Sequence, residues 1–77
     1  MRIRLYGRLG DEIGRETEVN APDGSTVAEI RRLLAASHPA ATEALARSRA
    51  CAGDRIVRDD ERPGSDVLEF LPPVSGG

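Results

Sequence analysis

The stretch PDGSTVAEIRRLL, residues 22–34, contains the clearest structural signals in the chain. Its first three residues are typical of a turn. Thr26 with Glu29 three positions later forms a capping box, which commonly marks the beginning of a helix. The spacing of the apolar residues that follow predicts a helix over residues 27–37, and Pro39 ends it.

The two faces of this helix differ in polarity. The apolar stripe consists of Val27, Ile30, Leu33 and Leu34. Arg31 and Arg32 lie away from the stripe and are interpreted as solvated side chains. Because proline suits the first turn of a helix, we expect Pro39 to start a second short helix that runs through Leu45.

Alternating segments on both sides of the helix predict strands. Residues 2–6 alternate polar and apolar, with Ile3 and Leu5 inward, and residues 15–19 alternate in the same way. A short excursion joins these two segments, so we expect a hairpin-like pair. Residues 67–70 form the last predicted strand.

Two further strands are less clearly marked. Residues 50–52 and 56–57 are short and mostly apolar, a turn at 53–54 separates them, and the sequence leaves their register open. The order is strand, strand, helix and short strands. A helix between strands normally packs across a sheet, so this order predicts an α+β domain, with a single sheet and one main helix on its face.

Length and composition restrict the function classes. A chain of 77 residues is one domain, and 39% hydrophobic with 31% charged residues is a soluble, globular balance. The net charge of −2 does not indicate nucleic-acid binding, and no apolar run is long enough to cross a membrane. Without a signal peptide's apolar stretch, we expect a cytoplasmic location. All 11 basic residues are arginine, which excludes lysine chemistry on this chain.

The single cysteine and the single histidine belong to no recognisable catalytic or metal motif. Cys51 is interpreted as a small core residue, since free cysteines are commonly buried, and His38 as a helix-boundary residue. The two together are too few for a structural zinc site. Gly7, Gly10 and Gly14 lack dinucleotide or P-loop spacing and are interpreted as strand-end and turn residues. We therefore expect no metal and no cofactor bound by this chain.

The strongest functional signal is the end of the chain, Leu71-Pro72-Pro73-Val74-Ser75-Gly76-Gly77. The two prolines end the preceding strand, because neither can donate a ladder hydrogen bond, and they favour an extended conformation. The glycines lack Cβ and can enter a narrow channel as bare backbone. Fully extended, the segment reaches roughly 23 Å. With Phe70 inward, Leu71 faces outward and suits a hydrophobic contact with a partner.

This ending resembles that of the MoaD family, the small subunits of molybdopterin synthase. The run Phe70-Leu71-Pro72-Pro73-Val74-Ser75-Gly76-Gly77 stands as the family's ending does, and the rest of the chain fits from Ile3 onward without large insertions. The resemblance implies a ubiquitin-like β-grasp fold, with a single mixed sheet in a domain over residues 1–70 and an extended tail over residues 71–77.

The resemblance also implies a sulfur-carrier chemistry. An E1-like adenylating enzyme uses ATP to activate the carboxylate of Gly77, and a sulfur donor converts the acyl-adenylate into a thiocarboxylate. The tail then enters the large subunit of molybdopterin synthase, two carriers serving one dimer of large subunits, and donates sulfur to a pterin precursor. The carrier is not catalytic alone. The reactive residues are Gly76 and Gly77, and the residues expected to contact the partner are Phe70, Leu71, Pro72, Pro73, Val74 and Ser75.

Three other functions stay open for a Gly-Gly ending. The chain could carry sulfur for thiamine or cysteine synthesis, although such tails usually lack the Pro-Pro-Val-Ser approach. It could be a ubiquitin-like modifier that joins the Gly77 carbonyl to lysines of target proteins. It could also be a β-grasp interaction module with an inert tail, whose binding survives deletion of Gly76-Gly77.

Overall fold

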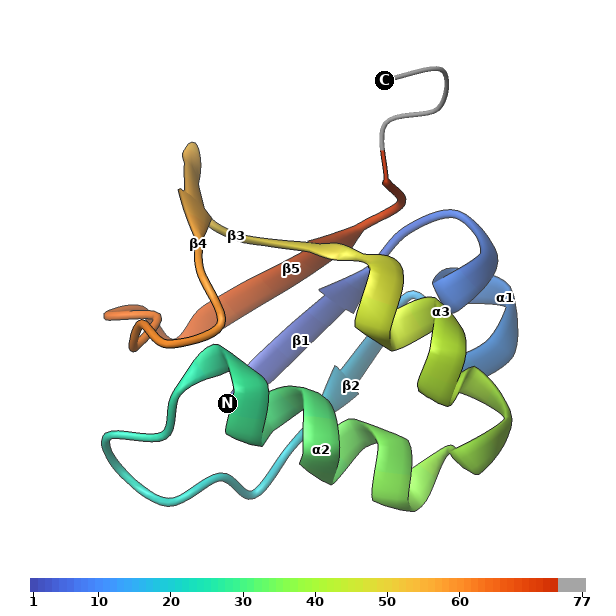
Figure 1. Cartoon of the computed structure of the whole chain (residues 1–77), viewed down its shortest axis with the longest axis horizontal. Helices are drawn as coiled ribbons and strands as arrows, with labels where there is room; N and C mark the ends of the chain where they lie inside the picture. The colour runs from blue at the N-terminus through green and yellow to red at the C-terminus, as the bar shows by residue number, and fades with distance from the viewer. Residues whose placement is uncertain (74–77) are drawn as a thin grey trace.

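The computed structural model of the 77-residue chain describes residues 1–73, which form one layer of strands and one layer of helices (Figure 1). The strands are β1 (Arg2–Leu5), β2 (Glu16–Glu18), β3 (Arg49–Ala52), β4 (Arg55–Val57) and β5 (Val67–Leu71). The helices are α1 (Arg8–Ile13), α2 (Val27–Ser37), the 3-10 turn η1 (Pro39–Ala41) and α3 (Thr42–Arg47). No helix within residues 1–73 is both long and apolar enough to span a membrane.

The strands form one mixed sheet in the order β2-β1-β5-β3-β4. The antiparallel pairing of β1 with β2 confirms the expected hairpin-like pair. On its other side β1 pairs in parallel with β5, and β3 pairs antiparallel with both β5 and β4. The last strand therefore lies in the middle of the sheet, and the predicted α+β class with one main helix on the sheet is confirmed (Figure 1).

Alternation along the two central strands places their apolar side chains in the core. Ile3 and Leu5 of β1, and Leu68 and Phe70 of β5, are at most 2% exposed, as the sequence predicts. They pack against buried residues of α2 in one continuous cluster. Burial of each such side chain contributes about 1.5–3 kcal/mol, so this cluster holds the helix on the sheet.

Two residues of α2 differ from the sequence prediction. Leu33, assigned to the buried stripe, is 37% exposed, and the side chain of Arg31, interpreted as solvated, is only 13% exposed. Both predictions are wrong for the same geometric reason. At 3.6 residues per turn, Arg31 lies about 40° from buried Val27 around the helix axis, whereas Leu33 lies about 120° away. The buried face of α2 is therefore centred on the Val27–Ile30–Leu34 line, and Arg31 is beside that line.

The beginning of α2 is fixed by the predicted capping box. The Glu29 N–H donates to Thr26 Oγ1 at 3.3 Å, and the Thr26 N–H donates to Glu29 Oε1 at 3.0 Å. The backbone hydrogen bond from Thr26 holds the pKa of Glu29 below its ordinary value. Two further N–H groups of the first turn donate to the carbonyls of Asp59 and Glu61, so the loop after β4 is tied to the helix.

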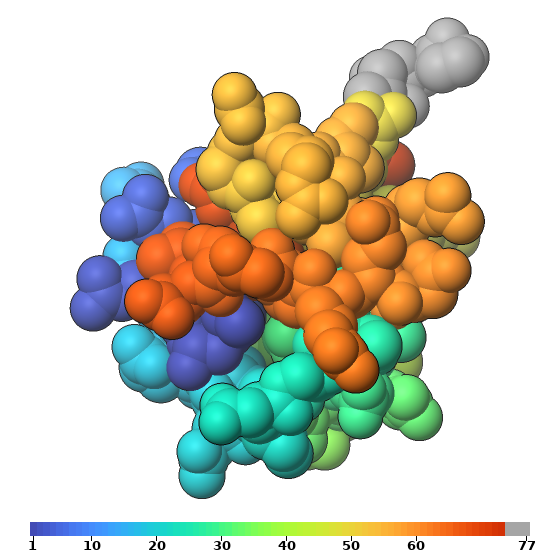
Figure 2. Space-filling model, turned by 90° about the vertical axis from the view of Figure 1, so that its left-hand side faces the viewer, coloured from blue at the N-terminus to red at the C-terminus, as the bar shows by residue number. Residues whose placement is uncertain are grey.

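The β3–β4 hairpin settles the register that the sequence leaves open. Ala50 pairs with Val57, and Cys51 pairs with Ile56. Ala50 and Val57 face the core, while Ile56 is 58% exposed on the other face of the sheet. On the side of the molecule shown in Figure 2, the hairpin and the following segment 58–66 form much of the surface.

Candidate functional site

The candidate site is the tail root, which we define as Leu71–Pro73, where the chain leaves the central strand β5. The prediction that the strand ends at the prolines is confirmed, since β5 ends at Leu71. Parallel pairing of β1 with β5 sets Leu5 beside Phe70, so the two strands end at the same edge of the sheet. The residues after β1 therefore lie next to the tail root.

Gly7 is in direct contact with the tail root. A Cβ added at Gly7 would lie only 2.8 Å from Cγ of Pro72. The backbone of Gly7, with φ 62° and ψ −139°, occupies a region that residues with a side chain rarely adopt. Its carbonyl also accepts the N–H of Gly10 at 3.0 Å at the start of α1. Gly7 thus contacts both the start of α1 and the tail root, and only glycine leaves room for the Pro72 ring.

The expected alternation at the end of β5 is confirmed. Phe70 is fully buried, and Leu71 is half-buried on the outer face of the sheet. The prediction that Phe70 contacts a partner is wrong for this structure, because its side chain fills the core and has no exposed surface. On the outer face beside Leu71, the Tyr6 hydroxyl donates to Glu69 Oε2 at 2.7 Å, and this hydrogen bond raises the pKa of Tyr6.

A groove of about 400 Å³ runs along the tail root between α1 and α3. Its walls include Leu9 and Ala44 as apolar residues and Arg8 and Glu12 as charged residues. Arg47 on its rim pairs with Glu43 at 2.9 Å. The groove is continuous with Pro72 and Pro73, so a partner that grips the tail can also contact these helices.

Cys51 does not lie in the core, so its interpretation as a core residue is wrong. In β3 the inward position belongs to Ala50, which is 1% exposed, and alternation turns Cys51 to the outer face, where it is half-buried. His38 lies between α2 and η1 and caps the end of α2, as the sequence predicts. Within residues 1–73, no group of three or more metal-ligating side chains comes together.

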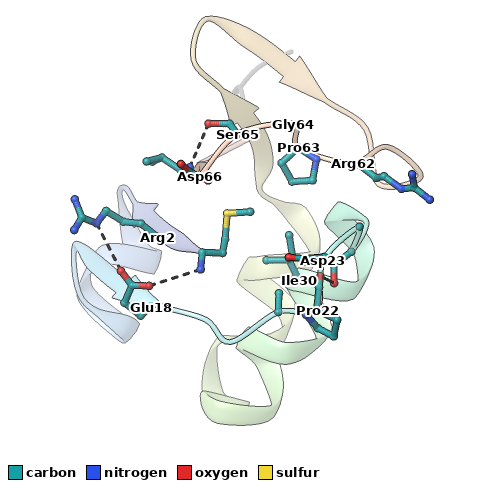
Figure 3. Close-up of a pocket in the computed structure, with 15 residues that line it drawn as sticks. Arg2, Glu18, Pro22, Asp23, Ile30, Arg62, Pro63, Gly64, Ser65 and Asp66 are labelled. Atoms are coloured by element: carbon teal, nitrogen blue, oxygen red, sulfur yellow. Dashed lines mark hydrogen bonds and ion pairs between the residues drawn. The ribbon is translucent and has the colours of Figure 1, made fainter.

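A larger hollow, of about 680 Å³, lies at the opposite end of the sheet (Figure 3). Its polar groups serve local structure. Glu18 pairs with Arg2 and with the N-terminal amine at 3.7 Å each. The hydroxyl of Ser25 donates to the Pro22 carbonyl, and that of Ser65 accepts the Val67 N–H. Both serine hydroxyls of this hollow thus bond to backbone groups of the adjoining turns.

The predicted site residues differ in what the structure says of them. Leu71, Pro72 and Pro73 lie together at the tail root, with Phe70 beneath them. Val74, Ser75, Gly76 and Gly77 lie outside the described residues, so their roles stay predictions. The sequence reasoning missed the role of Gly7, and no local signal marks it, because its contact depends on the pairing of the first strand with the last.

Comparisons with known proteins agree on the kind of domain. The family model described as the ThiS family matches residues 3–77. A crystal structure of SAMP1 from Haloferax volcanii is 23% identical, covers 99% of this chain and 97% of its own, and superposes with a TM-score of 0.78. A putative molybdopterin converting factor, subunit 1, from Pyrococcus furiosus is also 23% identical, covers 95% of each chain and has the same TM-score of 0.78. These likenesses confirm the ubiquitin-like β-grasp fold. No curated protein matches the chain.

Proposed function

Because the chain belongs to the ThiS family of ubiquitin-like sulfur carriers, we propose that it is the sulfur-carrying small subunit of a molybdopterin synthase. The observation that carries the proposal is the tail root, where Leu71-Pro72-Pro73 leaves the middle strand of the sheet against Gly7. The Pyrococcus protein with the same fold, named a molybdopterin converting factor, supports this choice of pathway.

The proposed chemistry takes place on Gly77. Its carboxylate attacks the α-phosphate of ATP on a partner adenylating enzyme, pyrophosphate leaves, and an acyl-adenylate forms. Hydrosulfide released by a sulfur donor then attacks the acyl carbon, AMP leaves with cleavage of the C–O bond, and loss of the sulfur's proton gives a thiocarboxylate. A thiocarboxylate sulfur is a better nucleophile than a carboxylate oxygen at neutral pH, so the modified tail can attack a pterin precursor in the large subunit.

This chemistry demands that the domain present its tail in one direction. Reacting atoms must approach to about 3–3.5 Å, and a small misplacement costs rate steeply. At the tail root Pro72 is held by contact with Gly7, and both prolines fix their own φ angles. Because these two residues are already restricted, less conformational freedom is lost when a partner orders the tail. The described part of the tail therefore suits insertion into a channel.

An intact-mass measurement tests the proposal. The purified protein is incubated with ATP, a family adenylating enzyme and a sulfur source, beside a variant that lacks Gly76-Gly77. We expect the wild-type mass to increase by the replacement of one oxygen with sulfur, and the truncated variant to stay unchanged. If an enzyme that thiolates a known carrier leaves this chain unmodified, the sulfur-carrier mechanism at Gly77 is wrong.

Binding to the large subunit tests the pathway. We expect the thiocarboxylated protein to form a complex with a molybdopterin-synthase large subunit, with two carriers per dimer, and to convert the pterin precursor. Thiocarboxylate formation without such a complex would indicate a carrier for thiamine or cysteine synthesis instead. Covalent adducts on target lysines in cell extract would indicate a protein modifier.

A further inference from the structure

Arg31 contacts several elements close to the tail root. Its Nε donates to Asp59 Oδ1 at 2.9 Å. One terminal nitrogen donates to the Leu45 carbonyl and, at 2.7 Å, to Ser48 Oγ, and the other donates to the Ser48 carbonyl at 2.8 Å. The guanidinium carbon also lies 5.0 Å from the centre of the Phe70 ring. One side chain of α2 thus contacts α3, the loop after β4 and the central strand β5.

The exposed ion pair contributes little to this arrangement. The Asp59 side chain is 61% exposed, and surface pairs of this kind contribute about 0–1 kcal/mol. The bonds to the Leu45 and Ser48 carbonyls are better shielded from solvent than this ion pair, because Ser48 is only 6% exposed. Arg31 donates to the Ser48 carbonyl, which follows the last turn of α3, and adds a further bond to the Leu45 carbonyl, which also accepts the N–H and the hydroxyl of Ser48. Its binding to the end of α3 is therefore the structurally important part.

The end of α3 leads directly to the tail root. Ser48 caps α3 and is followed by Arg49, the first residue of β3. Arg49 pairs with Leu71, the last residue of β5 before the prolines. Arg31 therefore fixes the strand that borders Leu71 on one side, while its guanidinium lies over Phe70, the residue immediately before Leu71.

We propose that Arg31 is a positioning residue that fixes the place and direction in which the tail leaves the domain. A planar guanidinium can reach carbonyl, hydroxyl and carboxylate oxygens and a ring face at once, which a lysine ammonium cannot do. The structural part of the proposal needs no assumption about function. Its consequence for catalysis rests on the proposed sulfur-carrier function.

Amide hydrogen exchange tests the structural part in the isolated protein. Since the Phe70 carbonyl accepts from Tyr6 on the β1 side, alternation turns the Leu71 N–H toward β3. Leu5, whose N–H donates to the Arg15 carbonyl at 2.9 Å, serves as the reference on the far side of β1. We expect Arg31→Met to accelerate exchange at Leu71 about tenfold more than at Leu5, the effect of losing about one hydrogen bond.

Two further variants make the exchange result decisive. Arg32→Met removes an exposed arginine of the same helix and should leave both amides unchanged. Arg31→Lys keeps a positive charge without the planar fork, and we expect it to accelerate exchange at Leu71 as Arg31→Met does, so it decides the matter if the Met variant does not fold. Equal acceleration at Leu71 and Leu5 would show a general stabilising role, and no acceleration at Leu71 would show no role at the tail. Either result overturns the proposal.

The catalytic consequence is measured separately. With a family adenylating enzyme, we expect Arg31→Lys to lower kcat for thiocarboxylate formation by at least about tenfold with little change in KM, because the docking surface is intact and only the tail is misplaced. A rise in KM alone, or wild-type kinetics, would contradict this consequence. If the wild-type protein forms no thiocarboxylate, the proposed function fails, and the exchange result still decides the role of Arg31.

Discussion

The two ends of the sheet differ in shape and in chemistry. At the tail end, Gly7, Leu71–Pro73 and the groove between α1 and α3 form a small, closely packed surface around the departing chain. At the loop end, the starts of β1 and β5 and the segments 22–25 and 62–66 enclose the larger hollow (Figure 3).

The larger of these two hollows lies at the loop end, away from the proposed tail site. The hollow at the loop end is lined by ion pairs and turn hydrogen bonds that serve the fold. The tail end has the groove of about 400 Å³ and a second hollow of about 650 Å³ beside Gly7, and it is where the proposed carrier tail leaves the domain. In a carrier whose reactive group is its own terminus, the functional surface is expected where the chain leaves the domain, and matched changes at the two ends test this difference.

The largest difference is expected for added length. One alanine after Gly77 moves the reactive carboxyl by up to roughly 3.6 Å, and we expect it to lower sulfur transfer to the pterin precursor by at least about 100-fold. The matched control is one alanine after Gly64, in an exposed turn at the loop end. Thermal unfolding should change little in either variant. Normal transfer by the tail-extended protein would rule out the tail mechanism.

Glycine substitution should lower the free energy of unfolding more at the tail end than at the loop end. Gly7→Ala introduces a Cβ 2.8 Å from Pro72 at a backbone geometry suited to glycine, and we expect a loss of about 3 kcal/mol in the free energy of unfolding. Gly64→Ala has a similar φ of 65° but open space around it, so we expect a loss of about 1 kcal/mol. Denaturant unfolding measures both. The cost at Gly7 should also fall by about 1 kcal/mol in a Pro72→Ala background, and purely additive costs would contradict the contact.

Side-chain truncation along β5 should weaken binding to the large subunit more at the tail end than at the loop end. Leu71 and Val67 share the outer face of the same strand and are both half-buried. We expect Leu71→Ala to weaken binding to the large subunit by about 30-fold, the effect of removing a contact of about 2 kcal/mol. Val67→Ala should leave this affinity within about twofold. Titration calorimetry would distinguish them, and equal losses would mean that the interface does not centre on the tail end.

The smallest effect is expected from the helix cap at the loop end. Thr26→Ala removes the hydroxyl of the capping box and should lower stability by about 1 kcal/mol at neutral pH without affecting sulfur transfer. The variant keeps the backbone N–H that donates to Glu29, which is the main cause of the lowered pKa of Glu29, and loses only the hydroxyl's bond to Glu29 Oε1. The hydroxyl's share of the stabilisation by the ionised carboxylate is present above the ordinary pKa of 4.5 and is lost as pH falls through the folded value, so the difference in Tm between wild type and variant should shrink slightly below about pH 4.5. A constant difference would show that the hydroxyl does not stabilise the ionised Glu29.

The parts of the fold that the sequence predicted rest on local rules. The capping box, the inward Ile3 and Phe70 and the end of β5 at the prolines follow from neighbouring residues alone, and all are confirmed. The candidate tail was recognised for the same reason, because its chemistry is a property of the terminal residues themselves. The predicted roles of Gly76 and Gly77 lie outside the described residues and await the experiments above.

What the sequence alone determined about this protein is therefore its strands and its main helix, and it predicts the chemistry of its ending. The tertiary structure decided which distant residues lie close to the start of the tail. Gly7 is placed there by the parallel pairing of β1 with β5, and Arg31 by the packing of α3 on α2. It also turned Cys51 outward, because Ala50 fills the inward position of β3. The physical reason is that spacing along a chain fixes periodicity, whereas the flank of a helix that is covered and the strand ends that meet depend on contacts between distant segments.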